Sequence, residues 1–262
     1  MTKLLEGKTA IIYGGGGDIG GGVARTFARE GARVFLAGRT REKLAAVNSQ
    51  ITSAGGSAEF ATVDALDEQA VEDHVRDVVS RAGRVDVSFN LVTRGDVQGT
   101  PLVQMTTDDL LRAVVNGLRS NFLTARAAAR HMIEQRSGVI LHLNSASGDA
   151  AMPGMGSTGP ADAATESFMR YLAAEVGPQG VRVCGIWTAA VAETLTSEKL
   201  AVVGGDGAPE PQQVLEMIAG MAALRRAPRL ADVVEAAAFL ASDRAVGITG
   251  TMVNVTSGLV LR

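Results

Sequence analysis

Short apolar runs typical of β-strands alternate with amphipathic runs typical of α-helices along the whole of this 262-residue chain. The expected strands lie at about 9–13, 32–37, 58–63, 85–91, 138–144, 181–187 and 250–255. The expected helices lie at about 19–30, 41–54, 67–82, 107–135, 160–176 and 230–241, with a shorter one at 212–224. Such alternation predicts a parallel sheet with helices on both faces. Seven strands fill one doubly wound sheet, so we expect residues 1–262 to form a single α/β domain.

Seven glycines occur in the nine residues 14–22, directly after the first expected strand and before the first expected helix. Glycine adopts positive φ and has no Cβ, so its backbone can lie against a ligand. At a helix N-terminus, free N–H groups and the positive end of the dipole favour an anion, most often the pyrophosphate of a dinucleotide. The run therefore predicts a dinucleotide site, with a flexible linker as the alternative.

Charge and composition argue against several other classes of protein. A net charge of −3 provides no basic surface for nucleic acid or for an anionic membrane. No apolar run approaches the ~20 residues of a membrane span, and the charged residues 1–8 are unlike a secretory signal. The single cysteine, Cys184, cannot form an internal disulfide, and its apolar neighbours favour a place in the core. We expect a cytoplasmic protein that binds neither nucleic acid nor a membrane.

The segment 188–229 is the one irregular part of the pattern, with glycines at 204, 205 and 207 and prolines at 209 and 211. Its short helix carries an apolar stripe at helical spacing. We interpret 188–229 as a lid segment that covers a substrate, with plain core packing as the alternative. An apolar, deformable lining would favour a hydrophobic small-molecule substrate, and its candidates are Met152, Pro153, Met155, Trp187, Met217 and Met221.

The order of several motifs resembles the short-chain dehydrogenase/reductase (SDR) family over essentially the whole chain. The family's Thr-Gly-x-x-x-Gly-x-Gly loop maps onto residues 13–20, and residues 144–148 (Asn-Ser-Ala-Ser-Gly) resemble the strand end that carries its catalytic serine. The stretches at 223–226, 232–234 and 239–242 also follow the family. This resemblance implies a Rossmann-type fold and oxidoreduction with a nicotinamide dinucleotide.

The resemblance also assigns roles to individual residues. It implies that Ser145 is the catalytic serine and that Asn116, followed by an extra Gly117, is the active-site asparagine. Asp64 would bond the adenine ring, and Thr194 would bond the carboxamide although it comes one residue late. The cofactor site that the resemblance implies comprises Gly14, Gly16, Gly17, Ile19, Gly20, Arg39, Asp64, Ala65, Asn90 and Thr194.

The family's tyrosine and lysine are replaced by Thr158 and Asp162, thirteen and seventeen residues after the serine. No shift of frame restores the pair, because the only tyrosines are Tyr13 and Tyr171 and no lysine lies between Lys43 and Lys199. An aliphatic hydroxyl is about five pKa units less acidic than a phenol, which removes about 7 kcal/mol of driving force for proton transfer. Thr158 is therefore a poor substitute acid. The remaining donors are Asp162 with a raised pKa, or a water.

Three further residues bear on the cofactor. Arg39 follows the second expected strand, where an acid would select NAD(H), and an arginine suits the 2′-phosphate of NADP(H). We expect NADP(H), with NAD(H) or an ordinary charged helix start as alternatives. Asp18 replaces the middle glycine of the family loop, and it either caps the helix in competition with the phosphate or points outward. Tyr13 is expected to pack in the core, with stacking on a ligand as the alternative.

Three functions remain open. The first is an NADP(H)-linked oxidoreductase in which Ser145 and Asn116 hold an apolar substrate and Asp162 handles the proton, with an enone or iminium as an acceptor that needs little protonation. The second is a non-redox cyclase or dehydratase on the same scaffold, and the third is a catalytically silent cofactor-binding protein. The three histidines do not cluster at metal-ligand spacing, so we expect no metal site. We expect a homodimer or homotetramer that pairs through the alanine-rich helix at 122–131.

Overall fold

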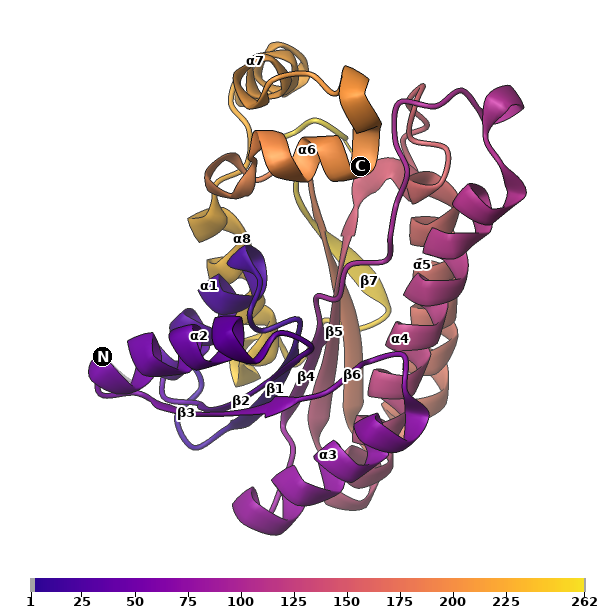
Figure 1. Cartoon of the computed structure of the whole chain (residues 1–262). Helices are drawn as coiled ribbons and strands as arrows, with labels where there is room; N and C mark the ends of the chain where they lie inside the picture. The colour runs from indigo at the N-terminus through magenta and orange to yellow at the C-terminus, as the bar shows by residue number, and fades with distance from the viewer. Residues whose placement is uncertain (1–2, 262) are drawn as a thin grey trace.

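Residues 3–261, which the computed structural model describes, fold around a seven-stranded sheet with helices on both faces (Figure 1). All neighbouring strands are parallel, in the order β3-β2-β1-β4-β5-β6-β7. The strands are β1 (Thr9–Tyr13), β2 (Arg33–Gly38), β3 (Ser57–Thr62), β4 (Val87–Asn90), β5 (Gly138–Ser145), β6 (Val181–Thr188) and β7 (Thr251–Val255). The doubly wound, Rossmann-type sheet predicted from the alternating pattern is confirmed.

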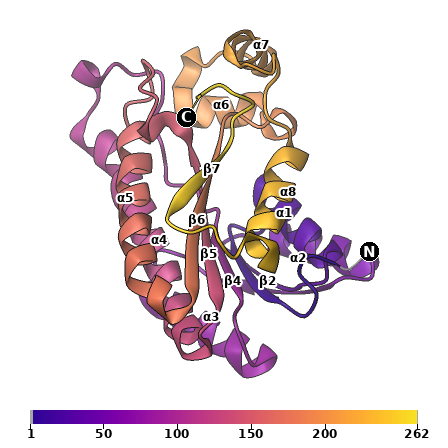
Figure 2. The same ribbon diagram turned by 180° about the vertical axis from the view of Figure 1, so that it is seen from behind.

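The helices form two layers, one on each face of the sheet (Figures 1 and 2). One layer consists of α1 (Asp18–Arg29), α2 (Arg41–Ser53) and α8 (Leu230–Ala241). The other consists of α3 (Glu68–Ala82), α4 (Thr107–Gln135) and α5 (Thr158–Val176). Strand β1 is buried along its whole length because both layers cover it. Its side chains alternate between the two cores, with Ile12 on the α1 side and Ile11 and Tyr13 on the α3 side.

The strand order reverses between β1 and β4. The chain runs from β1 outward to β3 and then returns to the other side of β1 to build β4 through β7. The loops that follow β1 and β4 therefore leave the sheet in opposite directions, which opens a crevice at the carboxyl ends of these strands. This crevice is where an open α/β sheet binds its ligand.

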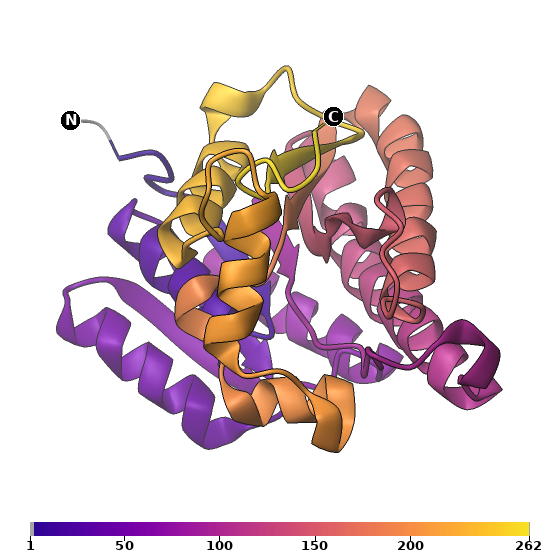
Figure 3. The same ribbon diagram turned by 90° about the horizontal axis from the view of Figure 1, so that it is seen from above.

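Most predicted elements agree with the structure to within three residues, and the main difference lies in the segment 188–229. Besides the expected helix, α7 (Pro211–Met221), the segment contains a second one, α6 (Ser197–Gly204). The hydroxyl of Thr196 caps α6 by accepting a hydrogen bond from the Lys199 amide at 3.3 Å. This short helix was not predicted because it ends among the glycines at 204, 205 and 207, a residue type that disfavours helix. Both helices lie over the carboxyl ends of the strands (Figures 1 and 3).

Two residues that were predicted from the sequence to lie in the core, Cys184 and Tyr13, are found there. Cys184 and Tyr13 are each 1% exposed, as predicted, and the Tyr13 ring meets His74 edge-on with 6.0 Å between ring centroids. Burial raises the pKa of the Tyr13 hydroxyl, so this phenol is a poor proton donor. Among residues 3–261, no helix is both long and apolar enough to cross a membrane.

Helix α4 limits the surface through which the predicted pairing could occur. The alanines at 125, 127, 128 and 129 are buried against the sheet, so their face of the helix cannot also contact a second copy of the chain. Small side chains are needed there because they let α4 approach β5 closely. The apolar residues that α4 exposes lie elsewhere on it, at Leu111, Val115, Leu118 and Phe122.

Candidate functional site

The glycine loop, residues 14–17, joins β1 to α1 at the crevice. Gly14 has a φ of +78°, and a Cβ there would lie 2.6 Å from the Leu91 carbonyl oxygen. Only glycine therefore allows the loops after β1 and β4 to lie against each other. A Cβ on Gly20 would collide with the Gly14 carbonyl, so this position also requires glycine for the helix to start close to the loop.

A cavity of about 260 Å³ opens between the glycine loop and the carboxyl ends of β2, β3 and β4. Of the ten predicted cofactor residues, its lining includes Gly14, Gly16, Gly17, Arg39, Asp64 and Ala65. The other four are not part of its lining: Ile19 and Gly20 are on α1, Asn90 ends β4, and Thr194 follows β6, where its hydroxyl donates to the Val191 carbonyl at 3.1 Å. Asn90 supports the cavity wall, because its side-chain oxygen accepts the Val92 amide at 2.9 Å.

The charges around this cavity fit a phosphorylated nucleotide. Arg39 and Lys43 both line it and both are exposed, whereas the guanidinium of Arg41 stacks over the Phe60 ring at 5.2 Å. Asp64 is the one acid in the lining. Two cations against one carboxylate favour an anionic ligand, and a rigid planar guanidinium suits phosphate. The residues present therefore fit the phosphate groups of a dinucleotide.

Asp18 leaves the helix N-terminus free. The N-cap of α1 is Gly17, and Asp18 pairs instead with the ammonium group of Lys199 on α6. Of the two alternatives for Asp18, the outward orientation is correct, because a cation from the segment 188–229 attracts its carboxylate. The amides that would hold a phosphate are not occupied by this side chain.

Ser145 and Asp162 meet at the carboxyl end of β5. Ser145 is the last residue of this strand, and its Oγ donates to Oδ2 of Asp162 at 2.5 Å. Asp162 lies one turn into α5 on its inner face and is 0% exposed. Asn144 holds this turn in place, because its Nδ2 donates to the Asp162 carbonyl at 3.3 Å. The strand end and the helix thus fix a hydroxyl against a buried carboxyl group.

Arg94 is a site residue that the sequence analysis missed. It lies in the loop after β4, and its Nη1 donates to Oδ1 of Asp162 at 2.6 Å. Its Nη2 donates to Asp96 at 2.8 Å, so one guanidinium binds two carboxylates. The signal available in the sequence was an acid in place of the family lysine, since a buried acid requires a cation from elsewhere. We call Arg94, Asp96, Ser145 and Asp162 the Asp162 cluster.

Helix α4 makes room for Arg94. A Cβ on Gly117 would lie 2.6 Å from Cδ of Arg94, so the extra residue after Asn116 is a glycine for steric reasons. Asn116 donates from Nδ2 to the Arg94 carbonyl at 3.1 Å. Asn116 was predicted to act at the reaction centre, and in this structure it fixes the backbone of the arginine.

Thr158 is buried at the start of α5, and its hydroxyl accepts a hydrogen bond from Nε2 of Gln98 at 3.2 Å. Ser157, beside it, forms two further bonds with the backbone of Val97, at 2.7 and 2.8 Å. These bonds tie the loop after β4 to the first turn of α5. The same loop carries Arg94, so they also help to hold the Asp162 cluster together.

Burial raises the pKa of Asp162 to about 6, although Arg94 and the hydrogen bond from Ser145 both act to lower it. Two neighbouring groups are also perturbed: burial lowers the pKa of His142 to about 4 and raises the pKa of Glu166. His142 is therefore neutral near pH 7. A carboxyl group that titrates near neutrality and is bonded to a hydroxyl can donate or accept a proton through that hydroxyl.

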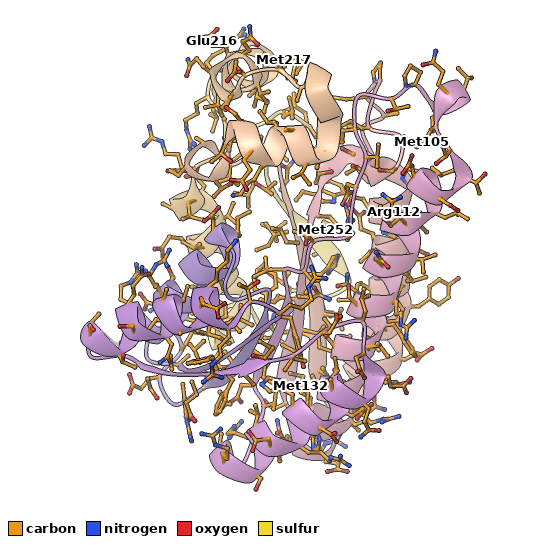
Figure 4. All side chains as sticks on the ribbon, in the orientation of Figure 1. Met105, Arg112, Met132, Glu216, Met217 and Met252 are labelled. Carbon is orange, nitrogen blue, oxygen red and sulfur yellow. The ribbon has the colours of Figure 1, made fainter. Side chains whose placement is uncertain are left out.

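The apolar side chains that were predicted to line a substrate site differ in their exposure. Of the predicted lining, Met152, Pro153, Met217 and Met221 are exposed and Met155 is half-buried. Trp187 is the exception, because it is buried in β6 and its Nε1 donates to Glu166 at 2.7 Å. Met217 on α7 and Met105 ahead of α4 lie on opposite sides of the upper end of the molecule (Figure 4). No group of three or more histidine, cysteine, aspartate or glutamate residues within 3–261 could hold a metal ion.

Comparisons with known proteins agree with this architecture. Residues 16–260 match the family model described as enoyl-(acyl carrier protein) reductase. The chain is 33% identical to tropinone reductase-like 2 of Erythroxylum coca, over 98% of its own length and 91% of that protein. It is 27% identical to the 3-oxoacyl-(acyl-carrier-protein) reductase of Rickettsia conorii, over 98% of each. The crystal structure of NAD+-bound xylitol dehydrogenase superposes with a TM-score of 0.86 at 25% identity, covering 97% of this chain and 99% of that one.

Proposed function

The chain belongs to the short-chain dehydrogenase/reductase family of NAD(P)-dependent oxidoreductases, and we propose on this basis that it is an NADP(H)-linked oxidoreductase of an apolar small molecule. The hydrogen bond between Ser145 and Asp162 carries the proposal, because it supplies a proton route that replaces the family's tyrosine. The dinucleotide supplies the hydride when it is bound. The glycine loop would hold its pyrophosphate, and Arg39 and Lys43 would hold the 2′-phosphate.

The proton leaves from the buried carboxyl group. Asp162 in its protonated form donates to Ser145, whose own hydrogen is then free to bond an acceptor atom of the substrate. When negative charge develops on that atom, the serine proton moves to it and the Asp162 proton replaces it. Asp162 has a pKa raised by burial to about 6, which is close enough to neutrality for this role. Asp162 is thus the non-standard proton donor, and Ser145 is the group that touches the substrate.

Arg94 supplies the positive charge of the site. In the family this charge comes from the lysine of α5, and here it comes from the loop after β4. The guanidinium keeps the carboxyl group of Asp162 in place in both protonation states, because it has a second partner in Asp96. In this proposal the exposed methionines at 152, 217 and 221 give the substrate an apolar, adaptable surface, and α6 and α7 of the segment 188–229 act as its lid.

Replacing both cations of the cavity, Arg39 and Lys43, with neutral residues is expected to weaken NADPH binding more than NADH binding. In the double variant Arg39→Gln/Lys43→Gln the dissociation constant for NADPH should rise about 10–100-fold, because charge-assisted hydrogen bonds contribute about 1.5–3 kcal/mol. NADH should bind with nearly unchanged affinity. Calorimetric titration of both dinucleotides tests this, with Arg41→Gln as the matched control because its guanidinium already stacks on Phe60. Equal weakening of both would remove the assignment to NADP(H), and wild-type protein that binds neither below millimolar would end the redox proposal.

A non-redox reaction is the second candidate, and the Asp162 cluster itself favours it. A carboxyl group with a pKa of about 6 can pass its proton through the Ser145 hydroxyl to a substrate. Such a donor serves a cyclase or dehydratase as well as a reductase. Turnover of a substrate in the complete absence of dinucleotide would select this function. A protein that binds NADPH and turns over nothing would be the catalytically silent alternative.

We also propose that the protein is a homodimer or homotetramer that pairs through the exposed apolar row of α4. Leu118 and Phe122 belong to this row, and Phe122 packs edge-on against Phe168 of α5. A charge in the middle of such an interface is costly, so Leu118→Glu is expected to shift the protein to monomer in sedimentation analysis. Val103→Glu, at a position that is 94% exposed outside α4, should leave the wild-type assembly intact. A monomeric wild type would contradict the proposal.

A further inference from the structure

We propose that the reacting group of the substrate is a carbon–nitrogen double bond, and that the Asp162 cluster binds it as the protonated iminium. This inference rests on the proposed oxidoreductase function and names the substrate class for the same site. Its basis is the net charge of the cluster and the direction of the hydrogen bonds around Ser145.

The cluster carries one excess negative charge when Asp162 is ionised, since two carboxylates face one guanidinium. The groups nearby do not reverse this. His142 is buried and neutral, and Glu166, one turn further along α5, is an acid whose outer partner Arg170 lies 4.0 Å away and is more than half exposed. Arg112 is engaged by Asp109 at 2.8 Å. A cation is therefore favoured beside Ser145 and a second anion is disfavoured.

The hydrogen bonds of Ser145 distinguish a carbonyl from an iminium. Its hydroxyl hydrogen lies in the bond to ionised Asp162, and its oxygen accepts the Ser147 amide at 3.2 Å. What Ser145 can still offer is an acceptor lone pair. A carbonyl oxygen cannot donate to it, whereas the N–H of a protonated imine can. Hydride addition to a carbonyl would also create an alkoxide next to the excess negative charge, whereas addition to an iminium creates a neutral amine.

The step balances with a reduced nicotinamide dinucleotide as the two-electron donor. The O–H bond of Asp162 breaks as its proton passes to Ser145, and the serine proton forms the N–H bond of the iminium. The hydride then adds to the carbon, the C=N π pair becomes the nitrogen lone pair, and the dinucleotide is oxidised. One proton and one hydride are consumed, and solvent returns the proton to Asp162.

The test compares 3,4-dihydroisoquinoline, a cyclic imine, with α-tetralone, a bicyclic aryl ketone of similar size. The ultraviolet spectrum of the imine reports whether it is protonated, so its apparent pKa can be measured free and bound, with no turnover required. We expect the wild-type protein to raise the bound pKa by about one unit or more, which corresponds to about tenfold tighter binding of the cation. Asp162→Asn should abolish the rise. Asp96→Asn removes the same amount of negative charge but leaves Ser145 bonded to an ionised Asp162, so it should show a rise that is smaller than in the wild type and that Asp162→Asn lacks.

With NADPH added, the imine should be reduced faster than α-tetralone at about pH 8. An unchanged pKa of the bound imine, or equal binding of the imine and the ketone at about pH 8, would overturn the inference. Reduction of α-tetralone under those conditions would leave the oxidoreductase function standing. Conversely, a raised imine pKa in a protein that does not bind NADPH would support the acidic iminium site while the oxidoreductase proposal fails.

Discussion

Replacing Asp162 with asparagine is expected to lower kcat for a carbonyl acceptor about 10²–10⁴-fold, the range that general acid catalysis contributes. The amide has the shape of the carboxyl group, so its oxygen can still accept from Arg94. It cannot pass a proton to Ser145, and the relay is lost. For the wild type, turnover of a carbonyl acceptor should fall as the pH rises through about 6, because the protonated form of Asp162 is the donor. The variant should lack this titration.

Asp96→Asn separates the proton role from the structural role. Asp96 binds the same guanidinium as Asp162 does, at 2.8 Å, but it has no bond to Ser145. Steady-state kinetics between about pH 5 and about pH 8 should therefore show that turnover by Asp96→Asn still falls as Asp162 loses its proton, with a modest change in kcat; the fall should move to lower pH, because the charge of Asp96 helps to raise the pKa of Asp162. If Asp162→Asn kept the wild-type kcat, and if its turnover still fell as the pH rose through about 6, Asp162 would be excluded as the proton donor.

The fold could be predicted because each element carries its own signal. Strands such as β1 are apolar throughout because they are covered on both faces, and the amphipathic helices between them show a 3.6-residue period. Helix α6 lacks such a signal, since it has only eight residues and none of those described is buried. The alanines of α4 show the other limit: composition identified the helix, but it did not say which face of it meets the sheet.

The site was predictable only where one residue type implies its chemistry. An acid in place of a lysine drew attention to Asp162. The raised pKa of this acid follows from its burial on the inner face of α5. Its partner Arg94 is 68 residues away in the chain, and no local pattern links them. Similarly, Lys199 settles the orientation of Asp18 from 181 residues away. Pairings of this kind depend on how loops from different strands meet at the sheet edge.

Arg94→Met is expected to destabilise the protein by about 3–5 kcal/mol at about pH 8, the cost of leaving a buried charge without its partner. The guanidinium side chain is 13% exposed and holds two carboxylates, one of them fully buried. The pKa of Asp162 is already raised by burial, and removal of the cation that lowers it must raise it further. A carboxyl group whose pKa is higher in the folded than in the unfolded state favours folding at low pH, and that contribution is lost as the pH rises.

The loss of stability in Arg94→Met should therefore shrink when the pH falls from about 8 to about 5, because Asp162 then takes up a proton and carries no charge. The midpoint of urea unfolding, measured at both pH values for wild type and variant, gives the comparison. Arg112→Met is the matched control: Arg112 is half-exposed and pairs with Asp109 at 2.8 Å, so its loss should cost no more than about 0.5 kcal/mol at either pH. If Arg94→Met were as stable as this control at about pH 8, Arg94 would not be balancing the Asp162 carboxylate. Both the charge count of the cluster and the proton route built on it would then fail together.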